Sequence, residues 1–227
     1  MRPQASLRPQ ERRPKVIFFD LDGTLVDTAP DLGGAANYIR STLGLAALPL
    51  PDYRPHASAG ARGLLGKALG ITPEHADFPR HRDAFLAHYA EHLADSSGLF
   101  EGFAETLTGF AKQAVRWGVM TNKPKQYTEP LMAALDLTLD ACAIVSADEV
   151  AKAKPAPDGL LLACERAGVA PEHCWYVGDD KRDIDAGRAA GMKTVAAAWG
   201  YEGEHALATW GADFTCAHPT DLLKLIA

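Results

Sequence analysis

Two aspartates stand two residues apart at the end of a short apolar segment near the start of the chain. Residues 15–20 read Lys-Val-Ile-Phe-Phe-Asp, and Leu-Asp-Gly-Thr follows. This length and composition predict a buried parallel strand, after which Asp20 and Asp22 can face one pocket. Gly23 lets the backbone turn so that N–H groups point at an anion. A divalent cation would stabilise two such close carboxylates, and Mg²⁺ prefers oxygen ligands. Taken alone, the pair could also be an acidic turn that caps a helix.

A second acidic cluster follows another expected strand, residues 174–178. It reads Gly178-Asp-Asp-Lys-Arg-Asp183, so that Asp179 leaves the strand and Asp183 begins the next helix. Asp183 could equally be a helix N-cap. Because the carboxyl ends of parallel strands meet at one rim of a sheet, two acidic clusters there predict a metal site. The sequence leaves open which of Asp179, Asp180 and Asp183 binds the metal directly, and we place Asp179 first.

Positive charge for an anionic substrate is expected from Lys154, which lies in Ala-Lys-Pro-Ala-Pro. The prolines stiffen the backbone, so the lysine can neutralise a phosphate or nearby aspartates from a fixed position. A solvated loop lysine is the simpler alternative, and Lys152 could compete for the role. Thr121 ends the segment Trp-Gly-Val-Met-Thr-Asn and offers a hydroxyl and an N–H to a phosphate oxygen.

The elements that must position these residues alternate along the chain. Strands are expected at residues 15–20, 117–122, 141–146, 174–178 and 193–198, and helices at residues 101–116, 126–135, 158–167, 183–190 and 220–226. This alternation predicts an α/β fold with a doubly wound, Rossmann-like parallel sheet. The segment from Asp31 to Leu93 is rich in Ala, Leu and His and is broken by five prolines. We expect it to form an inserted all-helical cap domain at residues 29–97, with the core domain at residues 15–28 and 98–227.

Composition restricts the partners and the compartment. The 227 residues carry a net charge of -6, and residues 1–15 alone carry +4, so the remainder has the wrong sign for a nucleic-acid surface. No apolar run is long enough to span a membrane, and because residues 1–15 lack an apolar segment we do not expect them to be a secretory signal. Four cysteines without a CxxC pair are typical of a reducing compartment, and we expect a cytoplasmic protein. Residues 1–14 are expected to be a disordered tail.

Two other motifs match known patterns only superficially. His88-Tyr-Ala-Glu-His92 has the spacing of an inverted zinc-protease motif, but it lies in a Pro-broken, His-rich region where chance matches are easy. Residues 60–67 resemble a phosphate loop, yet they fail the Walker spacing and follow no strand.

Four motifs in this order resemble the haloacid dehalogenase superfamily. They are Phe19-Asp20-Leu-Asp22-Gly-Thr24-Leu-Val-Asp27, Val119-Met-Thr121-Asn122, Lys154-Pro-Ala-Pro157 and Val177-Gly-Asp179-Asp180-Lys-Arg-Asp183. The helical segment after the first motif is similar to that superfamily's first type of cap domain. More narrowly, the chain resembles the phosphoglycolate phosphatase subgroup, and within it the N-acetylmuramic acid 6-phosphate phosphatases. Asp180 departs from this subgroup, much of which has Ser at that position.

The resemblance implies a Mg²⁺-dependent phosphatase that acts on a small phosphorylated metabolite. Asp20 would be the nucleophile and Asp22 the general acid and base, with Thr121 and Lys154 as further catalytic residues. The metal would be held by Asp20, the backbone carbonyl of Asp22, Asp179 and Asp183. Phosphate and substrate would contact Leu21, Gly23, Thr24, Asn122 and, through a substrate carboxylate, Arg62. The cap would exclude water, with Tyr53, Trp199 or Tyr201 as candidates for an aromatic wall.

Three other functions share parts of this pattern. A dehalogenase has the same fold and nucleophile but would need neither an acid at Asp22 nor a metal. A phosphomutase shares every catalytic motif and differs in returning the phosphoryl group to a sugar. A signalling receiver domain is phosphorylated on a similar sheet but would be about half this length and would lack the helical insert. The expected assembly is a monomer or a homodimer.

Overall fold

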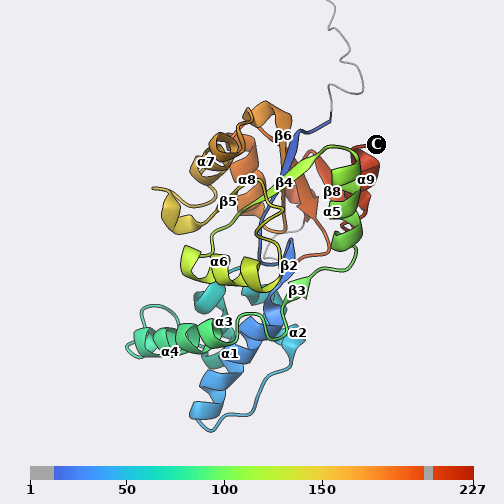
Figure 1. Ribbon diagram of the computed structural model, residues 1–227. Coiled ribbons are helices and arrows are strands. Elements are labelled where there is room, and N and C mark those ends of the chain that lie inside the picture. The colour runs from blue at the N-terminus through green and yellow to red at the C-terminus, as the bar shows by residue number, and fades with distance from the viewer. Residues whose placement is uncertain (1–12, 202–206) are drawn as a thin grey trace, which may run out of the picture.

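The computed structural model describes residues 13–201 and 207–227, and the expected disordered tail lies almost entirely outside them. A six-stranded parallel sheet in the order β5-β4-β1-β6-β7-β8 forms the centre of the molecule (Figure 1). Its strands are β1 (Val16–Phe19), β4 (Arg116–Met120), β5 (Ile144–Val145), β6 (Cys174–Gly178), β7 (Lys193–Ala197) and β8 (Phe214–Cys216). Strands β4 and β5 lie on one side of β1, and β6, β7 and β8 lie on the other. This is the arrangement of a doubly wound sheet.

The central strand β1 pairs in register with its neighbours β4 and β6. All four of its residues are buried, as a continuous apolar strand between two neighbours requires. Phe19 lies opposite Val119 of β4 on one side and Val177 of β6 on the other. The three strands therefore end at the same level, and the polar residues that follow them emerge at one rim.

Helices cover both faces of the sheet. They are α5 (Phe103–Lys112), α6 (Lys125–Ala134), α7 (Asp158–Ala167), α8 (Lys181–Ala189) and α9 (Asp221–Leu225). One apolar cluster joins the sheet to α5 and α9, and a second joins it to α7 and α8. Short 3-10 turns cover Ala147–Glu149, Pro171–His173 and Leu207–Thr209. This division of the core into two layers confirms the expected fold class.

A helical insert separates β1 from β4. It contains α1 (Ala29–Thr42), α2 (Leu50–Ala57), α3 (Gly60–Leu69) and α4 (Phe78–Glu91), which lie together below the sheet in Figure 1. These helices share their own apolar cluster, with Tyr53, Phe85 and Tyr89 among its largest buried side chains. A two-stranded antiparallel ribbon of β2 (Val26–Asp27) and β3 (Gly98–Leu99) joins the insert to the sheet domain.

The two connecting segments of the insert are tied together by Asp31. Its carboxylate accepts hydrogen bonds from the backbone N–H groups of Ser96 and Ser97 and from the Ser97 hydroxyl at 2.6 Å. Asp31 is buried at the start of α1, so these bonds fix the chain where it enters and leaves the insert.

Several expected boundaries were wrong. The ribbon strands and β8 have only two or three residues each, too short for a recognisable strand pattern. The expected helix at 101–116 is four residues shorter at its end, because Arg116 already belongs to β4. The last core helix before β7 begins at Lys181, since Asp180 caps it. In the part of the chain that the structure describes, no helix is long and apolar enough to cross a membrane.

Candidate active site

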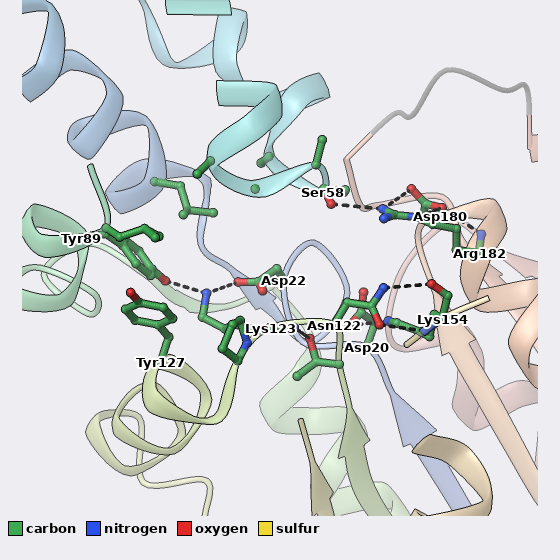
Figure 2. A pocket seen from close by; sticks show the side chains of 18 of the residues that line it. Asp20, Asp22, Ser58, Tyr89, Asn122, Lys123, Tyr127, Lys154, Asp180 and Arg182 are labelled. Carbon is green, nitrogen blue, oxygen red and sulfur yellow. Dashed lines mark hydrogen bonds and ion pairs between the residues drawn. The ribbon is translucent and has the colours of Figure 1, made fainter. Parts of the chain in front are cut away.

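The carboxyl ends of three adjacent strands bring the expected chemical groups together. Asp20 follows β1, Thr121 follows β4 and Asp179 follows β6. A cavity of about 390 Å³ opens between this rim and the helical insert (Figure 2). Its lining includes Asp20, Asp22, Thr121, Asn122, Lys123, Lys154, Asp180, Arg182 and Asp183 from the sheet domain, and Leu32, Ala57, Ser58, Phe85, Leu86 and Tyr89 from the insert. Polar groups thus form one side of the cavity, and the other side is largely apolar.

The carboxylate of Asp20 is held through one oxygen. Its Oδ1 accepts the N–H of Leu21 at 2.8 Å and lies 2.8 Å from the ammonium of Lys154. Among the described residues, none donates to Oδ2. The side chain is therefore oriented while one oxygen stays available to a substrate or a metal ion.

Lys154 is a buried cation with all its donors in use. Its Nζ lies 2.8 Å from Asp20, 2.7 Å from Asp183 and 3.0 Å from the hydroxyl of Tyr176. Burial disfavours the charged form, but Asp183 and Asp20 more than offset this, so the pKa of Lys154 lies above its ordinary value. Lys154 is therefore an ammonium at neutral pH.

Three carboxylates gather at the rim in a way that suits a metal ion. One oxygen each of Asp20, Asp179 and Asp183 lies within 4.8 Å of the others. Burial raises the pKa of Asp179 well above its usual range, and the neighbouring charges of Asp183 and Asp20 add to the rise. Burial likewise raises the pKa of Asp183 to about 7, although Lys154 opposes the effect. Oxygen donors that repel one another without a cation fit a hard divalent ion.

Backbone shape around Asp179 depends on glycine. Gly23 has φ +85°, and a Cβ at this position would overlap the Asp179 carboxylate. The Thr24 hydroxyl donates to Asp179 Oδ1 at 2.7 Å, and the Tyr201 N–H donates to Oδ2 at 2.9 Å. A Cβ at Gly178 would similarly overlap Asp183. The turn after β1 is thus built to let the acidic groups of β1 and β6 approach closely.

Asp22 is held in the same one-sided way as Asp20. The Lys123 ammonium lies 2.9 Å from Asp22 Oδ1, and the Thr28 hydroxyl donates to the same oxygen at 2.7 Å. Lys123 also donates to the Tyr89 hydroxyl of α4 at 2.8 Å (Figure 2). No hydrogen bond to Asp22 Oδ2 comes from residues 13–201 or 207–227, so this oxygen is free to exchange a proton with a bound molecule.

The comparisons with known proteins agree with this geometry. A model of the haloacid dehalogenase-like hydrolase family matches residues 14–191. The chain belongs to the haloacid dehalogenase-like hydrolases. An N-acetylmuramic acid 6-phosphate phosphatase from Pseudomonas aeruginosa is 39% identical to this hydrolase, over 94% of the chain and 95% of the relative. A phosphoglycolate phosphatase from Xanthomonas campestris is 38% identical, over 93% of the chain and 96% of the relative.

A solved structure has the same fold as the hydrolase. The structure, described as a predicted phosphoglycolate phosphatase from Haemophilus somnus, superposes with a TM-score of 0.82 at 27% identity, covering 94% of this chain and 98% of the other. The family and fold expected from the sequence are confirmed, and the names of these relatives support the expected phosphatase activity.

Most of the expected site residues of the hydrolase meet at the rim, and several make contacts there that were not predicted. The buried Leu21 side chain points into the core and contributes only its backbone N–H. Gly23 and Thr24 shape and hold Asp179. Asn122 lines the cavity, yet its amide bonds to the backbone N–H and C=O of Lys154 at 2.9 and 3.2 Å. Arg62 is exposed on α3 and does not line the cavity.

Among the polar residues that line the hydrolase's cavity, Lys123, Tyr89 and Arg182 were not expected from the sequence. Lys123 directly follows the Thr-Asn that ends β4, and Arg182 lies inside the second acidic motif, so both could have been noticed. Tyr89 could not, because only the tertiary fold brings α4 to the rim. Aromatic rings in the lining are Phe85, Tyr89 and Tyr127, and none of the three aromatic residues named beforehand lies there.

Replacing Lys123 with Met should slow the hydrolase without unfolding it. Because Lys123 orients Asp22 through Oδ1, its loss frees the carboxylate to rotate, and we expect kcat to fall about 10- to 100-fold with a small change in KM. Lys125→Met is the matched control, since Lys125 is about half-exposed and pairs with Glu129 and Glu149 outside the cavity. Steady-state kinetics with melting curves for both variants would check this, and an unchanged kcat in Lys123→Met would contradict it.

Proposed function

We propose that this protein is a Mg²⁺-dependent phosphomonoesterase that forms an aspartyl-phosphate on Asp20. The observation that carries the proposal is the pairing of Asp20 and Asp22. Each is fixed through Oδ1 by a lysine, and each keeps Oδ2 free at a cavity that also holds an acidic cluster. Two neighbouring carboxylates with separate lysine partners suit two separate roles, nucleophile and proton carrier.

In the first step the free oxygen of Asp20 attacks phosphorus, and the bond from phosphorus to the substrate's alcohol oxygen breaks. Asp22, in its protonated form, gives its proton to the departing alkoxide, which leaves as the alcohol. In the second step water attacks the phosphorus of the aspartyl-phosphate while Asp22 takes up a proton from it. Inorganic phosphate leaves and both aspartates return to their starting states.

The negative charge of the phosphate would be stabilised by a metal ion and by side chains that line the cavity. Bound Mg²⁺ would neutralise phosphate and carboxylate charge together and is best accommodated by Asp20, Asp179 and Asp183, with the backbone carbonyl of Asp22 as a further candidate. Thr121, which is 2% exposed at the cavity, offers its hydroxyl to a phosphate oxygen. Lys154 provides a positive charge within 3 Å of both Asp20 and Asp183, where it stabilises the negative charge of the transferring group.

The helical insert supports a role as a cap. Side chains from α1, α2 and α4 complete the cavity, and residues 58–61, which connect α2 to α3 and begin α3, also line it. Their apolar surface would displace water from the phosphorus, which favours transfer to Asp20 and strengthens the electrostatic interactions in the cavity.

Cavity size favours N-acetylmuramic acid 6-phosphate over 2-phosphoglycolate as the substrate. A volume of about 390 Å³ lies in the usual range for small-molecule sites, and the two-carbon ester would fill only a small part of it. The rings of Phe85, Tyr89 and Tyr127 add apolar surface to the cavity, which suits a sugar more than the two-carbon ester. Relatives of this chain carry both substrate names at nearly equal identity, so the size of the cavity is the stronger argument.

Phosphate release across a substrate panel tests the proposal. The panel contains N-acetylmuramic acid 6-phosphate, 2-phosphoglycolate and simple hexose phosphates, each with Mg²⁺ and with EDTA. We expect Mg²⁺-dependent release, with the highest kcat/KM for the muramic compound. A preference for 2-phosphoglycolate would overturn the substrate but keep the reaction. No release from any compound, with EDTA making no difference, would overturn the reaction itself.

A further inference from the structure

Charge in the cavity is nearly balanced before any substrate binds. Four aspartates line it, Asp20, Asp22, Asp180 and Asp183, together with three basic side chains, Lys123, Lys154 and Arg182. A substrate with a carboxylate as well as a phosphate brings a second negative group into this acidic environment. That group needs a cation with donors that the protein itself has not already used.

The two lysines have few donors left. All three donors of Lys154 are matched by Asp20, Asp183 and the Tyr176 hydroxyl. Lys123 uses two of its three on Asp22 and Tyr89, and it is only 8% exposed. Both ammonium groups also lie beside the reacting carboxylates, where a substrate carboxylate would be repelled.

Arg182 differs from both lysines because an entire nitrogen of its guanidinium is unused. Its Nε and Nη2 donate to the two oxygens of Asp180 at 2.9 and 2.8 Å, and Nη2 also donates to the backbone carbonyl of Ser58 at 3.1 Å. These bonds use three of the five guanidinium hydrogens. No residue in the described parts of the chain accepts from Nη1, which keeps two donors for a ligand.

The position of Arg182 is fixed by the fold. It lies in the first turn of α8, and its own backbone N–H donates at 2.8 Å to Asp180, the residue that caps this helix. Asp180 therefore holds both the backbone and the guanidinium. The side chain is 39% exposed and lies at the opposite end of the drawn pocket from Tyr89 and Tyr127 (Figure 2). A guanidinium held this way loses little conformational entropy when it binds an anion.

We infer that Arg182 selects substrates that carry a carboxylate in addition to the phosphate. This inference rests on the proposed phosphatase function and refines it. The carboxylate would accept hydrogen bonds from Nη1, while Asp180 and the Ser58 carbonyl keep the guanidinium in place. Arg62, the other candidate for this role, is exposed on α3 and lies outside the cavity lining.

A pair of substrates that differ in the carboxylate tests the inference. N-acetylmuramic acid 6-phosphate and N-acetylglucosamine 6-phosphate carry the same phosphate on the same carbon, but only the first has the lactyl carboxylate. We expect Arg182→Gln to lower kcat/KM for the muramic compound about 10- to 100-fold, mainly through KM, and to change the other substrate less than about threefold. Arg182→Lys, which keeps the charge but loses the planar fork, should fall between Gln and wild type.

The ratio of the two kcat/KM values is measured on one enzyme sample, so a partly unfolded variant does not distort it. Arg82→Gln is the matched control, because Arg82 is exposed on α4 and donates through Nε and Nη2 to Asp83. Equal losses for both substrates in Arg182→Gln would overturn the inference and indicate a role in phosphate binding or in holding the insert. A loss of selectivity in Arg62→Gln, with Arg182→Gln unaffected, would also overturn it.

A failure of the proposed function would look different. Wild-type enzyme that releases phosphate from neither sugar nor from 2-phosphoglycolate would overturn the proposed function, and the inference with it. If the wild-type enzyme prefers 2-phosphoglycolate, the comparison uses 2-phosphoglycolate and ethyl phosphate, which is a two-carbon ester without a carboxylate. Loss of the preference for 2-phosphoglycolate over ethyl phosphate in Arg182→Gln would support the inference. Retention of this preference in the variant would overturn it.

Discussion

Asp20→Asn should abolish phosphate release while leaving the protein folded. An amide cannot act as the nucleophile, and loss of a residue that forms a covalent bond to the substrate lowers kcat by about 10⁴-fold or more. The substitution removes a negative charge that raises the pKa of both Asp179 and Asp183. The remaining carboxylates of the cluster then repel one another less. We therefore expect the variant, measured in EDTA, to melt at a temperature no lower than that of the wild type in EDTA.

An acid quench during turnover tests the role of Asp20 as nucleophile. Wild-type enzyme quenched in acid during turnover of a labelled substrate should retain label on the protein, and Asp20→Asn should not. Asp185→Asn serves as the control, since Asp185 is 38% exposed on α8 and pairs with Lys181. Turnover by Asp20→Asn above about 1% of wild type, or label retained on it, would rule out Asp20 as the nucleophile.

The layout of the sheet domain was predictable because its signals are local. The sequence shows a short apolar strand followed by polar residues at β1, β4 and β6. Because parallel strands end at one rim, this pattern alone predicts that Asp20, Thr121 and Asp179 lie together. The ribbon strands β2 and β3 were not predictable, since two residues carry no period. Their pairing depends on contacts between segments far apart in the chain.

Residue roles were less predictable than residue positions. Thr24 was expected to contact phosphate, and the hydrogen bond from its hydroxyl to Asp179 was not predicted. Arg62 was expected to bind a carboxylate because arginine suits that group, but the helix turns it to solvent. The sequence could not distinguish Arg62 from Arg182, because the difference lies in which side of a helix faces a cavity between two domains. Similarly, Asp180 was one of three candidate metal ligands, and the sequence could not show that Arg182 donates to both of its carboxylate oxygens.

Removal of the metal should inactivate the enzyme and make its stability depend on pH in a specific direction. EDTA should lower kcat more than about 10³-fold, and Mg²⁺ should restore it. Without the cation, burial raises the pKa of folded Asp183 from the ordinary range of an aspartate to about 7. The folded state then holds a proton that the unfolded chain releases, so metal-free stability falls as pH rises across this window. Asp179, whose pKa is also raised, acts in the same direction.

Mg²⁺ should reverse this loss, because it takes the place of the protons on the carboxylates. We expect saturating Mg²⁺ to raise the melting temperature by about 5 to 10 °C at pH 7.5 and by clearly less at pH 5, where protons compete with the metal. Asp179→Asn should lose most of this shift. Asp180→Asn should keep it, since the oxygens of Asp180 are already occupied by Arg182. An equal shift at both pH values, or a shift lost in Asp180→Asn and kept in Asp179→Asn, would show that the metal binds elsewhere than among Asp20, Asp179 and Asp183.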